Sequence, residues 1–288
     1  MWIWADVGIK LPYGTTGEWR TTCPQCSPTR RKSRETCLAV NVDKGTWVCW
    51  HCGWKGGLHG RLHAAALPLP CPPAQPDARK RAALRRVWSE ASPLTAGDPV
   101  VTYLHQRGIT LSPHDAPAVL RYHPSLLYKD VDGGYTYHPA MVAKVQDPNG
   151  QSVSIHRTYL TADGRKAPVS TVKKLMSAAV PRGTVGGAIR LYPASDLLAV
   201  SEGIETALAV RLATGLPVWA AICAGGIARL VVPPEVSLVV ICADHDPDGL
   251  DAAKAFARRL LGEQRRVKIL TPETPGADWA DQQGVAHG

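Results

Sequence analysis

The chain has 288 residues, 45% of them hydrophobic and 20% charged, and a formal net charge of +9. This composition is typical of a globular protein with one large domain or two to three small ones, and it excludes a largely disordered chain. No apolar run approaches the roughly 20 residues of a membrane helix, and the N-terminus lacks the features of a signal peptide, so we expect a cytoplasmic protein with reduced thiols and no membrane partner.

Two Cys-x-x-Cys pairs, CPQC and CWHC, lie near the N-terminus and are separated by 22 residues. Each pair forms a knuckle that presents two thiolates to one ion, and two knuckles complete a tetrahedral zinc site. Redox-active pairs are the alternative, but no thioredoxin-like pattern surrounds either pair. We therefore predict a β-rich zinc ribbon over residues 1–63, with Cys37 and His51 ranked below the paired cysteines. The predicted zinc ligands are Cys23, Cys26, Cys49 and Cys52.

The segment between the two pairs is basic, and tryptophans flank the second pair. Cations and exposed aromatic rings together suit single-stranded nucleic acid, through phosphate attraction and base stacking. The alternative is that the tryptophans form the small core of the ribbon, which we favour for Trp47. We predict that the basic loop binds nucleic acid through Arg30, Arg31 and Lys32.

Residues 64–80 are rich in proline and are predicted to be an extended linker. The segment 77–92 then has helical periodicity with a basic face, and strands are expected at 138–145 and 152–160. Residues 81–194 are therefore predicted to form a mixed α+β domain. This part of the chain is basic, because residues 64–194 hold sixteen Lys and Arg against eight Asp and Glu.

From residue 197 onward, short apolar runs alternate with helical patterns. Strands are expected at 197–201, 217–223, 236–243 and 266–270, and helices at 204–215 and 250–262. This order predicts an α/β domain over residues 195–288, with a small parallel sheet covered by helices. Sites in such sheets lie at the carboxyl ends of the strands.

Acidic residues follow three of these strands: a Glu-Gly pair, a DxDxxG motif and the segment GADWAD. A lone DxDxxG also matches calcium loops and Asp-rich turns, but neighbouring strand ends would gather all three sets. Carboxylates that close repel one another unless a cation neutralises them. Glu205, one helical turn after the Glu-Gly pair, is expected on a solvated face. The predicted magnesium or manganese site consists of Glu202, Asp244, Asp246 and Asp278.

These motifs, in this order, resemble the TOPRIM domain shared by DnaG-type primases, topoisomerases and some nucleases. The combination of zinc ribbon, intermediate domain and TOPRIM resembles the phage and plasmid primases over essentially the whole chain. VTYLHQRGI (101–109), the segment 138–160 and SEGIETALA (201–209) are similar to sequences of that family. One departure is Ala277, where many relatives carry Lys before the aspartate.

The resemblance implies that Glu202 acts as general acid or base and that Asp244, Asp246 and Asp278 hold divalent metal. It also implies that basic residues of the intermediate domain face this site and hold template backbone and nucleoside triphosphate. We expect Arg157 and Lys166 to have this role, whereas a solvated basic surface is nearly as good an interpretation of Lys173 and Lys174.

The resulting hypothesis is a DNA primase that makes short RNA primers on single-stranded DNA by metal-dependent nucleotidyl transfer, for replication of phage, plasmid or mobile-element DNA. Its expected cofactors are structural Zn²⁺ and catalytic Mg²⁺ or Mn²⁺. Its expected partners are template, nucleoside triphosphates and a separate replicative helicase, because no P-loop is present. The alternatives are a TOPRIM nuclease and a non-catalytic, zinc-dependent accessory protein that binds single-stranded DNA.

Overall fold

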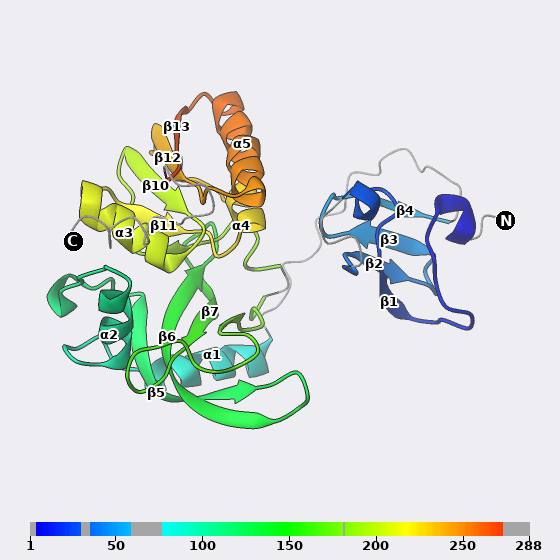
Figure 1. The fold of residues 1–288 in the computed structure, drawn as a ribbon. Helices are drawn as coiled ribbons and strands as arrows, with labels where there is room; N and C mark the ends of the chain where they lie inside the picture. The colour runs from blue at the N-terminus through cyan, green and yellow to red at the C-terminus, as the bar shows by residue number, and fades with distance from the viewer. Residues whose placement is uncertain (1–3, 30–34, 59–76, 181, 273–288) are drawn as a thin grey trace. The chain divides into compact units, whose positions relative to one another are not determined.

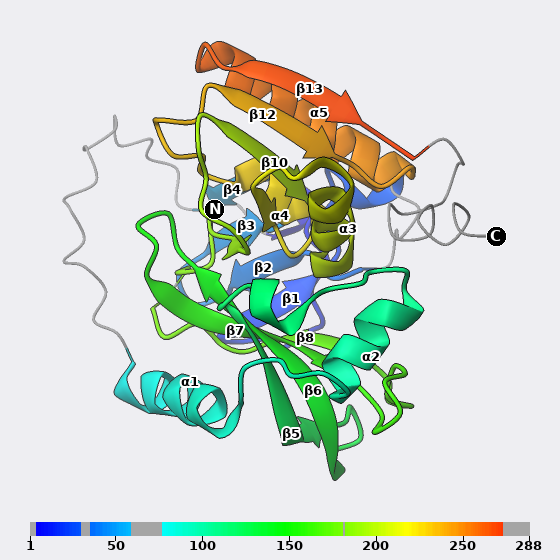
Figure 2. The ribbon, with the colours of Figure 1, turned by 90° about the vertical axis from the view of Figure 1, so that its left-hand side faces the viewer.

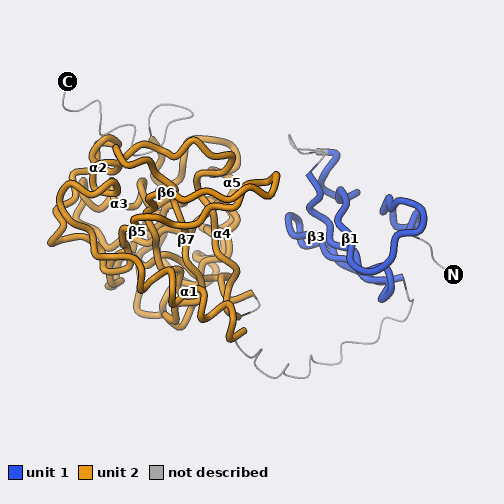
Figure 3. The backbone as a smooth tube through the Cα atoms, turned by 90° about the horizontal axis from the view of Figure 1, so that it is seen from below, with its two compact units in different colours: residues 1–72 blue, residues 73–288 orange. Residues whose placement is uncertain are grey.

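The computed structural model describes residues 4–29, 35–58, 77–180 and 182–272. The chain forms two compact units, residues 1–72 and residues 73–288 (Figure 3). Of the helices in the described ranges, none combines the length and the apolar character needed to span a bilayer.

Unit 1 is built on a four-stranded antiparallel sheet in the order β1-β2-β3-β4. The strands are β1 (Glu18–Thr21), β2 (Leu38–Asn41), β3 (Thr46–Cys49) and β4 (Lys55–Gly57), with short 3-10 helices η1 (Trp4–Val7) and η2 (Ser27–Thr29). Its small core joins Ile9, Leu38, Val40 and Trp47 to four cysteines. Trp47 is 8% exposed and packs against Trp4 and Trp54, which confirms its interpretation as a core residue.

The N-terminal half of unit 2 contains a second antiparallel sheet, in the order β5-β6-β7-β8. Its elements are α1 (Ala78–Glu90), α2 (Pro99–Gln106), η3 (Pro113–Asp115), β5 (Leu120–Lys129), β6 (Tyr135–Gln146), β7 (Ser152–Tyr159) and β8 (Lys173–Leu175). Asp77 caps α1 by accepting from the backbone N–H groups of Arg79 and Lys80, so the helix begins inside the predicted 64–80 linker.

The C-terminal half of unit 2 contains a five-stranded sheet in the order β13-β12-β10-β11-β9, in which only β9 runs antiparallel to its neighbour. Strands β13, β12 and β10 lie side by side in Figures 1 and 2. Its elements are β9 (Ile189–Arg190), β10 (Leu197–Ser201), α3 (Ile204–Thr214), β11 (Val218–Ala220), α4 (Ala224–Arg229), β12 (Leu238–Cys242), α5 (Pro247–Gly262) and β13 (Arg266–Leu270). The predicted strand–helix alternation is confirmed, and α4 and β9 are additional elements.

Unit 2 is layered, and one apolar cluster joins its two sheets. α1 covers one face of the sheet β5–β8, and α4 and α5 cover the outer face of the sheet β9–β13. Between the sheets, α2 and α3 pack together with residues such as Met141 of β6 and Val240 of β12. The predicted domains 81–194 and 195–288 therefore lie in one compact unit with a shared core. The expected fold class is confirmed: a β-rich N-terminal unit with a cysteine cluster, an α+β middle and an α/β domain with parallel strands.

Candidate functional site

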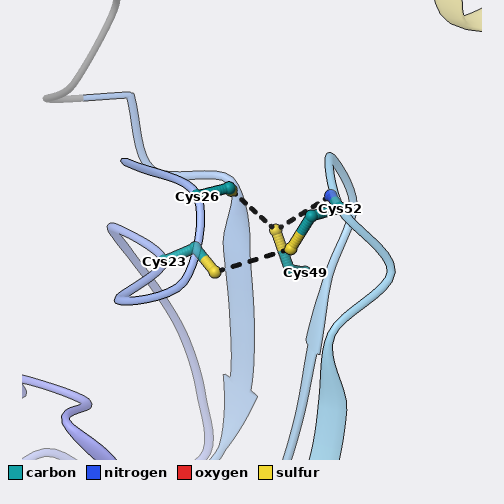
Figure 4. A group of neighbouring side chains, drawn as sticks. All are labelled: Cys23, Cys26, Cys49 and Cys52. Carbon is teal, nitrogen blue, oxygen red and sulfur yellow. Dashed lines mark hydrogen bonds between the residues drawn. The ribbon is translucent and has the colours of Figure 1, made fainter. Parts of the chain in front are cut away.

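The four paired cysteines of unit 1 converge on one point (Figure 4). The Sγ atoms of Cys23 and Cys52 lie 3.8 Å apart, and those of Cys26 and Cys49 lie 3.7 Å apart. Four thiolates at the zinc–sulfur distance of about 2.3 Å occupy the corners of a tetrahedron whose edge is about 3.8 Å. The sulfur positions therefore fit a tetrahedral metal ion, and the backbone has already formed the site.

A fifth thiol, that of Cys37, lies beside this group. Its Sγ is 3.7 Å from Cys49 and 3.9 Å from Cys26. Burial raises the pKa of the Cys23 and Cys26 thiols, so a cation is needed to hold these sulfurs as thiolates. Cys37 does not belong to the group in which all sulfur atoms lie within 4.8 Å of one another, which consists of the four paired cysteines.

A hollow on the surface of unit 1 is lined by exposed tryptophans and cations. Trp19 and Trp50 are 43% and 52% exposed, and the guanidinium carbon of Arg20 lies 6.0 Å from the centre of the Trp50 ring. The hollow has a volume of about 800 Å³ and includes these residues together with Lys44 and Lys55. We call these five residues the tryptophan face. The predicted loop residues Arg30, Arg31 and Lys32 lie outside the described residues.

Two of the predicted acidic residues meet at the carboxyl edge of the parallel sheet in unit 2. Strands β10 and β12 are neighbours, and Ser201 is paired with Cys242. Glu202 is one residue beyond its strand and Asp244 two residues beyond, and both line one cavity. The neighbouring strand β13 ends beside them, because the N–H of Ala243 donates to the carbonyl of Leu270.

The DxDxxG motif begins helix α5. Asp246 is the N-cap of α5, and its Oδ1 accepts from the N–H of Gly249 at 2.7 Å. A Cβ on Gly249 would lie 2.9 Å from the carbonyl oxygen of Asp244, so glycine is required by this close approach. The capping bond uses one of the two oxygens of Asp246, and the side chain is exposed at the same edge. Asp248 lies in the first turn of α5, where a negative charge interacts favourably with the positive end of the helix dipole.

The pKa of Glu202 is raised to about 7 by burial and by the charges of Asp244 and Asp246. A carboxyl group poised near neutral pH is suited to proton transfer. Its main chain is held in place by Ile222, whose N–H donates to the Glu202 carbonyl at 2.8 Å. Ile222 has a φ of 76°, and a β-branched residue adopts this left-handed conformation at a cost of roughly 1–3 kcal/mol.

These carboxylates are close enough to interact electrically, but they are not packed around a point as the cysteines are. Among the described residues, the four cysteines form the only group of three or more potential metal ligands whose donor atoms all lie within 4.8 Å of one another. Like charges keep the carboxylates apart unless a cation joins them. Asp278, the fourth predicted residue, lies outside the described residues. The chain leading to it passes the site, since Nδ1 of His245 donates to the carbonyl of Pro272 at 2.9 Å.

The cavity that contains Glu202 and Asp244, which we call the Glu202 cavity, has a volume of about 180 Å³ and lies between the two sheets of unit 2. Its walls combine carboxylates with cations and one imidazole. Its polar side chains include Tyr103, Arg107, His156, Lys166, Lys173, Glu202, Glu205 and Asp244. Such a mixture is suited to a ligand that carries both metal-bound phosphate and polar groups.

Glu205 does not lie on a solvated face, and that expectation was wrong. It is 5% exposed, accepts from the Tyr103 hydroxyl at 2.8 Å and forms an ion pair with Lys173 at 2.8 Å. Burial raises its pKa, but the charge and hydrogen bond of Lys173, together with a backbone hydrogen bond and that of Tyr103, outweigh burial and lower the pKa to about 2. Glu205 is therefore a buried anion. An acidic residue one helical turn after Glu202 was the only sequence signal that could have drawn attention to it.

The two basic residues predicted to bind phosphate, Arg157 and Lys166, differ in their position relative to the cavity. Lys166 lines the Glu202 cavity, whereas Arg157 donates to the Tyr159 hydroxyl at 3.0 Å and is not part of the cavity wall. Its neighbour along β7, His156, is in the wall instead, because successive strand residues point to opposite faces. Burial lowers the pKa of His156 to about 4, so its imidazole is neutral at neutral pH.

Comparison with known protein families gives one match in each half of unit 2. Residues 78–187 match a family described as a domain of unknown function (DUF7146), and residues 197–286 match the family described as the Toprim domain. No curated protein matches the chain.

The chain is similar in fold to solved primase structures. One is the Aquifex aeolicus primase, zinc binding and RNA polymerase domains, with a TM-score of 0.51, 18% identity, and coverage of 99% of this chain and 79% of that chain. Another is a DnaG primase catalytic domain bound to ssDNA, with a TM-score of 0.50, 17% identity, and coverage of 73% and 77%. The likeness is one of fold.

Proposed function

We propose that this chain, whose residues 197–286 are a Toprim domain, is a DNA primase. It would join ribonucleotides into short primers on a single-stranded DNA template. The observation that carries the proposal is that Glu202 and Asp244 line one cavity at the carboxyl edge of a parallel sheet, where the charges of Asp244 and Asp246 raise the pKa of the glutamate. The fold likeness to the Aquifex aeolicus primase structure, over 99% of this chain, supports it.

The oxygen donors at this edge fit magnesium or manganese, which prefer carboxylates. Asp244 and Asp246, with Asp278 as a further proposed ligand, would hold the cations. Such ions would lower the pKa of the attacking 3′-hydroxyl and would stabilise the negative charge of the leaving pyrophosphate. In the reaction the primer 3′-oxygen forms a bond to the α-phosphorus of the incoming nucleotide, and the bond from that phosphorus to the bridging oxygen breaks. Glu202 would accept the proton of the 3′-hydroxyl.

The cysteine group of unit 1 would hold structural zinc, because its donor set and tetrahedral spacing suit that ion. The tryptophan face is the proposed template surface of this unit, since bases stack on exposed aromatic rings and cations attract the phosphates. Arg30, Arg31 and Lys32 remain proposed contacts to the template. In unit 2, Lys166 is proposed to bind nucleotide or template phosphate. Arg157 remains a predicted phosphate contact, although its hydrogen bond to the Tyr159 hydroxyl does not favour that role.

A primer synthesis assay tests the proposal against its rivals. The full chain is incubated with single-stranded template, four ribonucleoside triphosphates and magnesium or manganese. New primers support a primase, a shortened template indicates a Toprim nuclease, and a gel shift without products indicates a binding protein. Glu202→Gln and Asp244→Asn should each abolish primers while zinc content stays the same. Synthesis that persists in either variant would remove that residue from the reaction. The proposal also includes association with a phage or a plasmid and with a separate helicase. The genetic context of the gene tests the first association, and pull-down experiments test the second.

A further inference from the structure

Glu205 is held from two directions by the other half of unit 2. The ammonium of Lys173 in β8 lies 2.8 Å from Oε1 and 2.9 Å from Oε2, and the hydroxyl of Tyr103 in α2 donates to Oε1 at 2.8 Å. A carboxylate that is 5% exposed stays charged only when it is paired, and removing one partner of such a pair is costly. Glu205 therefore determines where the Nζ atom of Lys173 lies.

Lys173 itself is partly open. Its side chain is 43% exposed and lines the Glu202 cavity. An ammonium has three donors, and two contacts with Glu205 leave capacity for a further acceptor. The charge of Lys173 also acts on Glu202, because it lowers the pKa of that carboxyl group against the effect of burial. The ammonium thus has Glu205 on one side and the cavity on the other.

We propose that Glu205 is a positioning residue that holds Lys173 at the wall of the Glu202 cavity, where the ammonium binds a phosphate group of the incoming nucleoside triphosphate. Lysine binds phosphate as a point charge, so its value depends on where the charge is held. Arg107 and Lys166 lie in the same wall and add to the positive potential. The identity of the ligand rests on the proposed function, whereas the positioning of Lys173 does not.

The competing explanation is that the Glu205–Lys173 pair only fastens α3 to β8. Both explanations predict a loss of stability when the pair is broken, so stability cannot separate them. They differ in whether Glu205 affects phosphate binding, and in whether that effect requires Lys173. A double-mutant cycle measures this dependence directly.

Two measurements on the full chain test the proposal, with folding checked by circular dichroism. The first is the rate at which acetic anhydride labels Lys173, read by mass spectrometry against the exposed Lys254. The second is the affinity for inorganic pyrophosphate, read by calorimetry. We expect Glu205→Gln to speed the labelling of Lys173 severalfold and to weaken pyrophosphate binding about tenfold. Lys173→Gln should weaken binding to the same degree, and the double variant should be no weaker than Lys173→Gln alone.

Lys268→Gln is the matched control, because it removes the same charge as Lys173→Gln from an exposed position of β13 that is not part of the cavity wall. Its affinity should stay within about twofold of the unmodified chain. If Glu205→Gln does not fold, Glu205→Asp replaces it, since the shorter carboxylate should displace Lys173 and weaken binding. Unchanged labelling, additive effects in the double variant or no pyrophosphate binding by the unmodified chain would overturn the proposal. If the chain makes no primers, but Glu205 still affects pyrophosphate binding through Lys173, only the primase function would be rejected.

Discussion

Ser201 and Cys242 are register partners in the neighbouring parallel strands β10 and β12. This one pairing determines where the proposed catalytic carboxyl groups of unit 2 lie. Because both strands run in the same direction, the residues that follow them, Glu202 and Asp244, emerge at the same edge of the sheet although they are far apart in the chain. The raised pKa of Glu202 shows that the two carboxyl groups interact there.

Replacing Glu202 by Gln should stabilise unit 2 above neutral pH. The folded pKa, about 7, exceeds the ordinary value of 4.5, so the folded state holds this proton more tightly. The stability linked to Glu202 is therefore fully present below pH 4.5 and is lost as the pH rises through about 7. Gln cannot ionise and avoids this loss.

Thermal unfolding in magnesium-free buffer checks this prediction. The Tm of the variant should equal that of the unmodified chain at pH 4 and should be a few degrees higher at pH 8. Added magnesium should reduce the difference, because a bound cation relieves the same repulsion. Identical melting curves at both pH values would mean that Glu202 is not crowded by the aspartates.

Asp246 has two roles that substitutions can separate. Asn is as good an N-cap as Asp, so Asp246→Asn should preserve the stability of α5, whereas Asp246→Ala should cost about 1 kcal/mol. Both variants lose the negative charge, and both should lose primer synthesis. Urea unfolding and the primer assay report the two effects, with Asp251→Asn on the exposed side of α5 as a control that keeps both properties. Full activity in Asp246→Asn would limit this residue to capping.

Removing one cysteine of the metal group should release the ion and unfold unit 1. Metal binding supplies about 10–16 kcal/mol in zinc-finger peptides, far more than the small core of this unit can replace. In Cys49→Ser we expect atomic absorption to find no zinc, together with loss of the structure around Trp47. Cys223→Ser, in an exposed position of unit 2, is the control and should retain one equivalent of zinc. Retention of zinc by Cys49→Ser would point to Cys37 as a replacement ligand.

The two tryptophans of unit 1 should behave differently. Trp50→Ala on the tryptophan face should weaken binding of an oligothymidylate about tenfold, because stacking contributes about 1–3 kcal/mol per base. Its zinc content and thermal stability should not change. Trp47→Ala should instead destabilise the unit by about 3–5 kcal/mol, since it empties the core. Fluorescence anisotropy and thermal unfolding separate the two, and equal oligonucleotide affinity in Trp50→Ala would reject the template surface.

Spacing and periodicity were sufficient for the features that depend on local sequence. The two cysteine pairs predicted their own cluster, and the apolar runs at 197–201 and 236–243 predicted the strands that deliver Glu202 and Asp244. The three-residue strand β8 and the two-residue strand β9 are too short to show a period. Helix α4 has two glycines among six residues and a poor helix propensity, so packing around buried Ile227 stabilises it.

Glu205 shows the limit of such reasoning. Its helix pattern reveals an apolar face, but it does not reveal that a second sheet covers the remaining face. The residues that keep it charged, Tyr103 and Lys173, are 102 and 32 positions away in the chain. Only the tertiary contact between the two halves of unit 2 makes a buried glutamate favourable there, and no local pattern records that contact.

The apolar cluster shared by α2, β6 and α3 places the seam between the two family matches inside a hydrophobic core. Each half therefore depends on the other to bury part of its apolar surface. A chimaera that joins this Toprim half to the middle half of a distant relative would inherit mismatched packing and a buried glutamate without its lysine, a defect of about 3–5 kcal/mol. In protein engineering, residues 73–288 should therefore be exchanged as one block.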